Sequence, residues 1–408
     1  MRIAVQGCCH GELDRVFKTV QRMNSRNKID LLIILGDFQS IRKPKDFKSI
    51  SIPPKYQKLG DFHKYYSRNT PAPVPTIFIG GNHESMRHLM LLPYGGYAGK
   101  RIYYLGYSNV IWFKGVRIAS LSGIWKEWDV DKARPSWEEM ESCQWQKNIR
   151  SLYHVRKTDI LPLMTIKKPL SLMLSHDWPN EITKHGDVAG LLKKKPFFKK
   201  DIQNDNLGSP ANWKLLQRLR PEWWLSAHLH VRFQAEVDHT TSSEGPLLKK
   251  NSDEIDLDMS SDEETASHEC PTHSNESTKF LALDKCLPGR QFLEVIEVEA
   301  DESHPSFKTT EMYWDEEFIS NLRYLEKNRE ALEDKPFSEI ELSSLENTAD
   351  DSGYPPISPH DLIVPRYEYS IQKREKDQTN YFIEKFLTLK DQTNLSNEPS
   401  SEDVKKDS

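Results

Sequence analysis

The sequence predicts an α/β fold in which two β-sheets pack face to face and helices flank them. Strand-like apolar runs alternate with helical patterns up to about residue 235, which indicates parallel strands joined by helices. Residues Val110–Leu121 predict a hairpin that turns at Lys114–Gly115, so antiparallel strands join the parallel ones. The length of 408 residues favours one large domain with an accessory region.

Five of the apolar runs share one property, because each stops at a residue type that binds metal ions. A short apolar run that ends in Gly or Ser before a polar cluster is typical of a buried strand feeding a loop. A short helix is expected between the first two runs, over Val16–Met23. The five runs are Arg2–His10, Leu31–Asp37, Thr76–Glu84, Leu170–Asp177 and Trp223–His230.

The polar residues at the ends of these runs are candidate metal ligands. Side chains at the carboxyl ends of parallel strands can converge on one crevice. Two metal ions ~3.5–4 Å apart that share one carboxylate can clamp the attacking and leaving oxygens of a phosphodiester. The candidate ligands are Cys8, His10, Asp37, Asn82, His176, His228 and His230.

The C-terminal part of the chain has a different composition. Residues 237–278 are acidic and almost free of aromatic residues, so they cannot bury enough apolar area to offset ordering entropy, and we expect disorder. Two strand-like segments follow, beginning at Phe280 and Phe292, and we place them on the sandwich. A helix is expected over Glu316–Glu333. The predicted divisions are 1–236, the acidic segment 237–278, a C-terminal domain 279–389 that packs on the first, and a disordered tail 390–408.

Charge is divided unevenly between the two halves of the chain. Residues 1–236 contain 38 Lys and Arg and 21 Asp and Glu, a net charge of +17, whereas the remainder carries −22. A basic half of this size is typical of a protein with a polyanionic substrate. The alternative is ordinary surface charge that maintains solubility.

Composition excludes several other classes of protein. No run approaches the ~18 apolar residues of a membrane span. The first predicted strand begins almost at Met1, so we expect no signal peptide. Five scattered cysteines argue against a disulfide framework and for a reducing compartment.

The motifs around the candidate ligands resemble those of the calcineurin-like metallophosphoesterases, namely D-x-H, G-D, G-N-H-E, a separate His and G-H-x-H. Two departures, Cys8 in place of Asp and Ala227 in place of Gly, are similar to the lariat debranching branch of that family. The similarity is strongest over Ile3–Phe233 and returns at Phe280–Pro288. The segments that carry it are Gly7–His10, Gly36–Ser40, Ile52–Tyr56, Gly80–Ser85, His176 and Ala227–His230.

The resemblance implies two metal sites that share the carboxylate of Asp37. One ion would lie between Cys8, His10, Asp37 and His230, and the other between Asp37, Asn82, His176 and His228. A thiolate at Cys8 is softer than a carboxylate, so we expect two divalent ions from the set Fe²⁺, Zn²⁺ and Mn²⁺.

The resemblance also implies that His83 protonates the leaving oxygen, since it directly follows the ligand Asn82. Glu84 and Asp177 are candidates to orient the ligand histidines. The alternative is that both are ordinary loop carboxylates.

The segment from Gly123 to Arg156 is rich in aromatic and basic residues, and the resemblance implies that it includes a loop recognising lariat RNA. Aromatic faces stack unpaired bases and arginines hold phosphates. The alternative for its four tryptophans is a place in the core; these are Trp125, Trp128, Trp137 and Trp145. The candidate RNA contacts are Lys55, Tyr56, Arg150, Tyr153, His154 and Arg156.

The expected function is hydrolysis of the 2′–5′ phosphodiester bond at the branch point of excised intron lariat RNA. Two alternatives are another metallophosphoesterase, such as a nuclease or a protein phosphatase, and a scaffold of the same fold that has lost catalysis. We expect a monomer that acts on branched RNA in the nucleus, with the cytoplasm as a second compartment. The basic run Lys193–Lys200 is a candidate nuclear signal or RNA contact, or simply a solvated face.

Overall fold

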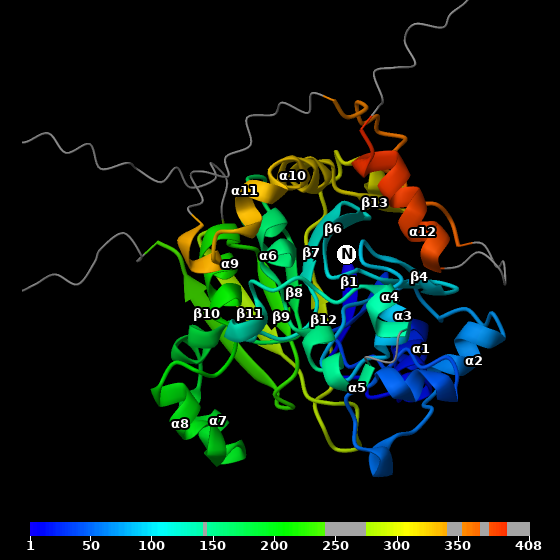
Figure 1. The fold of residues 1–408 in the computed structure, drawn as a ribbon. Helices are drawn as coiled ribbons and strands as arrows, with labels where there is room; N and C mark the ends of the chain where they lie inside the picture. Colours follow the sequence, from blue (N-terminus) through cyan, green and yellow to red (C-terminus); the bar gives the residue numbers. More distant parts are fainter. Residues whose placement is uncertain (142–144, 241–274, 341–352, 368–374, 390–408) are drawn as a thin grey trace, which may run out of the picture.

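The computed structural model contains two β-sheets packed face to face, with helices on both outer faces (Figure 1). This layered arrangement confirms the predicted α/β sandwich. Within the described part of the chain, no helix is long and apolar enough to span a bilayer. The described residues are 1–141, 145–240, 275–340, 353–367 and 375–389.

The first sheet has six strands, of which the inner ones are parallel. These strands are almost fully buried, as expected for parallel strands covered on both faces. At one edge β12 pairs antiparallel with β1 and places Glu297 opposite Arg2. The strand order is β12 (Leu293–Glu297), β1 (Arg2–Gln6), β2 (Leu31–Ile34), β3 (Thr76–Phe78), β5 (Ile102–Tyr104) and β4 (Gly96–Gly99).

The second sheet has seven strands and also takes strands from the C-terminal region. Strand β11 lies parallel to β9 and antiparallel to β10, so it fills the position between them. At the opposite edge β13 pairs antiparallel with β6. The strand order is β10 (Phe233–Asp238), β11 (Ser277–Ala282), β9 (Trp223–Ser226), β8 (Leu172–Ser175), β7 (Val116–Leu121), β6 (Ser108–Phe113) and β13 (Met312–Trp314).

Alternate strand residues divide between separate cores, because successive side chains point to opposite faces of a sheet. Ile3 of β1 joins Leu172 of β8 in the core between the sheets. Ala4 points the other way and joins Val16 of α1 on the outer face of the first sheet. Helices α6 and α9 cover the outer face of the second sheet in a further cluster.

Twelve α-helices are present in the described residues, and most are short. The sandwich therefore carries its chemistry in loops held by strands. Two 3-10 turns, η1 (Pro44–Ser49) and η2 (Pro54–Tyr56), lie between β2 and α2. The helices are α1 (Leu13–Arg26), α2 (Phe62–Ser67), α3 (Met86–Leu89), α4 (Trp137–Glu139), α5 (Trp145–Asn148), α6 (Lys157–Met164), α7 (Val188–Lys194), α8 (Lys199–Gln203), α9 (Pro210–Leu219), α10 (Glu316–Lys327), α11 (Arg329–Glu333) and α12 (Glu375–Phe382).

The predicted hairpin is confirmed, since β6 and β7 are antiparallel and turn at Lys114 and Gly115. Both turn residues have positive φ angles, 49° and 76°, which matches the right-handed twist of the two strands. The predicted helix after β1 is confirmed and longer than expected. The predicted single helix Glu316–Glu333 is wrong in one respect, because it breaks at Asn328 into α10 and α11.

The strands predicted at Phe280 and Phe292 are present as β11 and β12, one in each sheet. The sheet extends into both ends of the segment expected to be disordered, since β10 runs to Asp238 and β11 starts at Ser277. The pairing of these two strands therefore moves the start of that segment beyond Asp238 and its end before Ser277. Residues 241–274 of that segment and the expected tail 390–408 lie outside the described residues.

Candidate metal centre

The candidate ligands lie in loops at the carboxyl ends of five parallel strands. These ends point to the same side of each sheet, so the loops meet at one end of the sandwich. The loops after β1, β2 and β3 of the first sheet and after β8 and β9 of the second carry Cys8, His10, Asp37, Asn82, His176, His228 and His230.

Several of these residues have a left-handed backbone. The φ angles are 51° at His10, 46° at Asp37, 57° at His228 and 50° at His230. This conformation is uncommon for residues other than glycine and costs about 1–3 kcal/mol each. Strain of this kind is kept where the surrounding structure fixes a functional side chain.

Two glycines leave room for the ligands. A Cβ atom at Gly36, whose φ is +99°, would collide with the ring of His176. A Cβ atom at Gly81 would collide with Asp37. The glycines that precede Asp37 and Asn82 are thus explained by the close approach of side chains.

The first group of ligands is closely packed. Ligand atoms of Cys8, His10, Asp37 and His230 all lie within 4.8 Å of one another. The Nε2 atoms of His10 and His230 are 3.0 Å apart, so two imidazole nitrogens point at the same position. A thiol, two imidazoles and a carboxylate form a donor set suited to a soft or borderline divalent cation.

Asp37 is placed between two groups of ligands. Its Oδ2 lies 3.6 Å from Nε2 of His10, and its Oδ1 lies 3.6 Å from Nε2 of His176. Each carboxylate oxygen therefore faces a different histidine. A carboxylate in this orientation can be shared between two cations.

The second group has buried atoms that lack partners in the described structure. Nδ1 of His176 donates to the carbonyl oxygen of Leu35 at 2.6 Å, which leaves the lone pair on Nε2. That Nε2 atom and Oδ1 of Asn82 are buried without a hydrogen bond. Because buried polar atoms are normally paired, these two fit the ligands of an ion beside Asp37. The ring of His228 completes the group, with its centroid 5.0 Å from that of His176.

Burial controls the protonation states of the cluster. It lowers the pKa of His176 to about 4 and that of His230 to about 3, so both rings are neutral at pH 7. At Asp37 burial acts in the opposite direction, but the neighbouring histidines outweigh it and lower the pKa. Burial raises the pKa of the Cys8 thiol, so binding of a cation there must release a proton.

His83 lies beside this cluster and is held at three atoms. Its backbone amide donates to Oδ1 of Asp37 at 2.8 Å. Its Nδ1 is 3.1 Å from the carbonyl oxygen of Ser51, and its Nε2 is 3.1 Å from Nδ2 of Asn82. The ring is 5.8 Å from that of His10 between centroids, so an acid at His83 would act next to the ligands.

The two carboxylates expected to orient ligand histidines contact backbone amides instead. Glu84 accepts from Phe38 at 2.7 Å, Gln39 at 2.8 Å and Gly81 at 3.1 Å, and so joins the loops after β2 and β3. Burial, with the charge of Asp37, raises its pKa to about 8. Asp177 accepts from the amides of its own loop and of the Gly123–Arg156 segment.

Comparison with known proteins is consistent with this geometry. Residues 1–232 match the calcineurin-like phosphoesterase family, and residues 275–353 match the C-terminal domain of lariat debranching enzymes. The lariat debranching enzyme of Saccharomyces cerevisiae is 56% identical over 404 residues, covering 95% of this chain and 99% of the relative. This chain belongs to the lariat debranching enzyme family.

Other members of the family differ in length. The Schizosaccharomyces pombe enzyme is 39% identical over 371 residues, with 79% of this chain and 78% of the relative covered. The human enzyme is 42% identical over 316 residues, with 77% and 52% covered, so the chain spans about half of that relative. Membership implies a metal-dependent phosphodiesterase with divalent ions.

The described part of the aromatic segment of this debranching-family chain packs against two separate clusters. Trp145 is buried with Met86, and Trp137 packs against the same cluster. Trp125 is partly buried against the second sheet, whereas Trp128 is 64% exposed. Trp145 is therefore a core residue, which was the alternative to RNA contact for the four tryptophans. Trp128 is the most exposed of the four and so the most accessible to a base.

Two of the expected RNA contacts are directed into the protein. Nδ1 of His154 lies 2.6 Å from Oδ2 of Asp129, and His154 is buried. Arg156 is buried and donates to the carbonyl oxygens of His154 and Ser151 at 3.0 and 2.9 Å. These side chains hold the segment together, so the expectation that they contact RNA is corrected.

The other four expected contacts remain accessible to different degrees. Tyr56 is 62% exposed, and Nζ of Lys55 lies 4.8 Å from its ring centroid. Arg150 is exposed. Tyr153 is half-buried, and its hydroxyl lies 3.5 Å from Oγ of Ser51, the residue whose carbonyl oxygen contacts His83.

Two main-chain carbonyl groups that belong to the site were not identified from the sequence. The carbonyl oxygens of Leu35 and Ser51 orient His176 and His83. A main-chain carbonyl is present at every residue, so no residue type could have indicated these roles.

Proposed function

We propose that this chain hydrolyses the 2′–5′ phosphodiester bond at the branch point of intron lariat RNA, giving linear RNA. The observation that carries the proposal is the placement of Asp37 between two sets of ligands, with His83 adjoining, in a chain closely related to lariat debranching enzymes. The yeast and human relatives carry that name.

Cys8, His10 and His230 would hold one divalent ion and Asn82, His176 and His228 the other, with Asp37 between them. When bound, two such ions supply a nucleophile at neutral pH and neutralise charge that develops on the phosphoryl oxygens. The soft thiol at Cys8 favours Fe²⁺, Zn²⁺ or Mn²⁺ over Mg²⁺.

The protein's own groups would provide position and a proton. His83, held by Ser51 and Asp37, donates a proton to the departing 2′-oxygen. Lys55, Tyr56, Trp128 and Arg150 offer exposed aromatic and basic groups for RNA. We also propose a monomer located in the nucleus, which the exposed Lys193, Lys194, Lys199 and Lys200 support as a basic signal.

A short branched RNA tests the reaction. The molecule contains one 2′–5′ bond and several 3′–5′ bonds, and the purified protein is incubated with it in EDTA or with Fe²⁺, Zn²⁺, Mn²⁺ or Mg²⁺ added singly. We expect cleavage of the 2′–5′ bond alone, and none with Asp37→Ala, which also fails to bind metal. Comparable cleavage of both linkages would replace the proposal with a general nuclease, and metal binding without any cleavage would indicate a scaffold.

A further inference from the structure

Helix α12, near the end of the described chain, is joined to the site by a buried carboxylate. Neither family match reaches this helix, since they end at residues 232 and 353. Glu375 opens α12 and is buried. Its Oε1 lies 3.3 Å from Nη1 of Arg42, 3.1 Å from Nε2 of His88 and 3.1 Å from the hydroxyl of Tyr66.

Arg42 extends this contact into the segment that follows Asp37. It binds Asp46 through Nε at 3.1 Å and Nη2 at 3.2 Å, and Nη2 also donates to the carbonyl oxygen of Arg87 at 3.0 Å. Ser49 then donates to the carbonyl oxygen of Asp46 and accepts from the amide of Arg87. The network therefore fixes η1 against α3, the helix that follows His83.

His88 makes a second connection between the same elements. Its Nδ1 lies 3.1 Å from the carbonyl oxygen of Ser40, three residues after Asp37. Burial alone would raise the pKa of Glu375, but the contacts with His88 and Arg42 outweigh it and lower the pKa to about 2. The carboxylate is thus charged at neutral pH, hydrogen-bonded to Arg42 and within 3.1 Å of Nε2 of His88.

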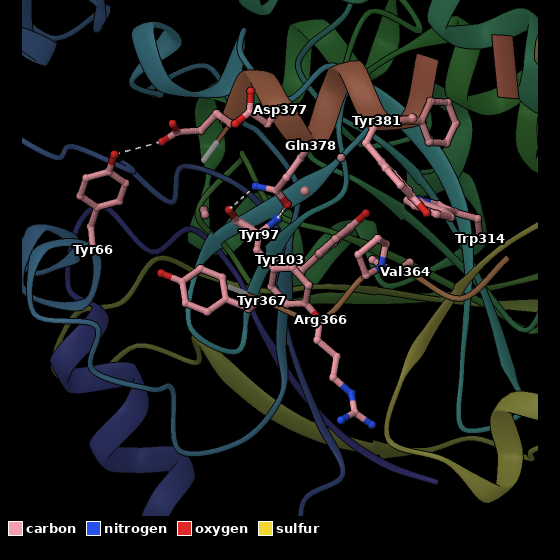
Figure 2. Close-up of a pocket in the computed structure, with 16 residues that line it drawn as sticks. Tyr66, Tyr97, Tyr103, Trp314, Val364, Arg366, Tyr367, Asp377, Gln378 and Tyr381 are labelled. Carbon is pink, nitrogen blue, oxygen red and sulfur yellow. Dashed lines mark hydrogen bonds between the residues drawn. The ribbon is translucent and has the colours of Figure 1, made fainter. Parts of the chain in front are cut away.

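The position of α12 is itself fixed by contacts with the sandwich. Figure 2 shows Gln378 against the backbone of Tyr97, where it donates to the carbonyl oxygen at 3.0 Å and accepts from the amide at 2.7 Å. Phe382 stacks on Tyr94, with ring centroids 4.9 Å apart. A cavity of about 290 Å³ lies beside the helix and is lined by Gln378 and Phe382 among others. The two contacts with Tyr97 and Tyr94 therefore bridge the helix to the sandwich next to this cavity.

We propose that Glu375 is a positioning residue for branch cleavage: through Arg42 and His88 it fixes the segment whose Ser51 carbonyl orients His83. This inference rests on the proposed debranching reaction. Ser51 lies just beyond η1, the element that the Glu375 network holds, and contacts Nδ1 of His83 at 3.1 Å. Loss of the charge at Glu375 would allow that carbonyl to shift, and a small misplacement of a catalytic group costs up to ~10²-fold in rate.

The test compares two substrates that differ in their need for a general acid. The 2′-oxygen of RNA leaves poorly and requires a proton, whereas the p-nitrophenolate of bis(p-nitrophenyl) phosphate leaves without one. Glu375→Gln keeps the size of the side chain and removes its charge. We expect kcat on branched RNA to fall about tenfold or more with KM nearly unchanged, while metal content and hydrolysis of the nitrophenyl ester stay within about twofold.

Asp377→Asn is the matched control, because it removes the same charge from an exposed position on α12. It should leave both rates unchanged. If Glu375→Gln does not fold, Glu375→Asp keeps the charge, shortens the reach and should give the same selective loss in weaker form.

Two results would overturn the inference alone: full activity of Glu375→Gln on branched RNA, or an equal loss on both substrates, which would indicate a merely structural role. A wild-type protein that hydrolyses the ester and not the branch would overturn the proposed function itself, and the inference with it.

Discussion

Among the candidate ligand atoms, the sulfur of Cys8 is the one that we expect to affect most which metal binds. It lies in the group with His10, Asp37 and His230, and its thiol is fully buried. Cys8→Asp replaces soft sulfur with hard oxygen, so metal preference should shift from Zn²⁺ or Fe²⁺ toward Mn²⁺ or Mg²⁺. Elemental analysis and activity titrations with each ion measure this shift. An unchanged metal profile would remove Cys8 from the ligand set, and Cys9→Ser, at the adjacent buried thiol, serves as the control.

His83 offers a separate prediction, because its side chain lies next to the ligands without belonging to either group. His83→Ala should keep metal content and affinity for branched RNA but lower kcat by ~10²–10⁴-fold, the usual contribution of a positioned proton donor. Single-turnover kinetics and a binding assay separate the two effects. Loss of metal in this variant would place His83 among the ligands instead.

For individual residues, the sequence indicated which residue types lie near the site better than it indicated where their side chains point. Cys8, Asp37 and the site histidines were identifiable because each ends a strand-like run. Arg156 was expected to contact phosphate, but its side chain is buried. That burial depends on how a segment without a periodic pattern folds, so the sequence could not indicate it. The left-handed backbone at Asp37 was also unpredictable, since it results from contacts across loops rather than from local propensity.

Among the elements, helix α10 depends on one carboxylate at its start. Asp315 caps the helix at the amide of Phe318 and forms a buried ion pair with Arg117, with bonds of 2.8 and 2.7 Å. Asp315→Asn keeps a capping oxygen but leaves Arg117, among the described residues, with Glu317 as its one charged partner. We expect a loss of about 3 kcal/mol in unfolding free energy, the lower end for a broken buried pair.

Urea denaturation monitored by circular dichroism measures this loss. Glu316→Gln removes the same charge from the exposed neighbouring position and should change stability by less than about 0.5 kcal/mol. Equal stability of the two variants would show that the buried pair contributes nothing to the fold.

The break between α10 and α11 shows what a periodic pattern cannot predict. Phe318 and Leu322 follow helical spacing and pack on the second sheet, as expected. Arg323 is buried on the same helix because Nε donates to the carbonyl oxygen of Phe386, which is remote in sequence. The helix ends at Asn328, whose side chain donates to the carbonyl oxygen of Tyr324 at 2.8 Å. The spacing of apolar residues does not indicate this end.

For the whole molecule, the C-terminal strands are essential to both sheets. A protein truncated after residue 240 lacks β11, the neighbour of β9, and β12, the neighbour of β1. Exposed edges on two ligand-bearing strands should make this protein insoluble or inactive. Soluble expression and branched-RNA cleavage are the measurements, and an active truncated protein would contradict the role of these strands.

An internal deletion provides the control for truncation. The amide of His239 donates to the carbonyl oxygen of Glu276 at 2.8 Å, so the ends of β10 and β11 lie side by side. Replacing residues 241–274 with a short Gly-Ser linker should therefore keep branch cleavage within a few-fold. Loss of activity there would assign a function to the removed segment.

The sandwich could be predicted from the sequence, but its strand order could not. Alternating strands and helices specify the parallel part, and the hairpin at Lys114 specifies β6 and β7. Nothing in the pattern of β11 indicates that it enters between β9 and β10, because that position depends on which strand edges remain free after the rest has folded.

The place of β11 and β12 also affects how the protein is made. During translation, β1, β2, β3, β8 and β9 leave the ribosome before either strand that completes their sheets. At about 5–20 residues per second, the nascent chain carries unpaired strand edges for several seconds. Formation of the catalytic end of the sandwich is therefore a late event in synthesis, and a ribosome stalled before Ala282 would present an aggregation-prone intermediate to chaperones.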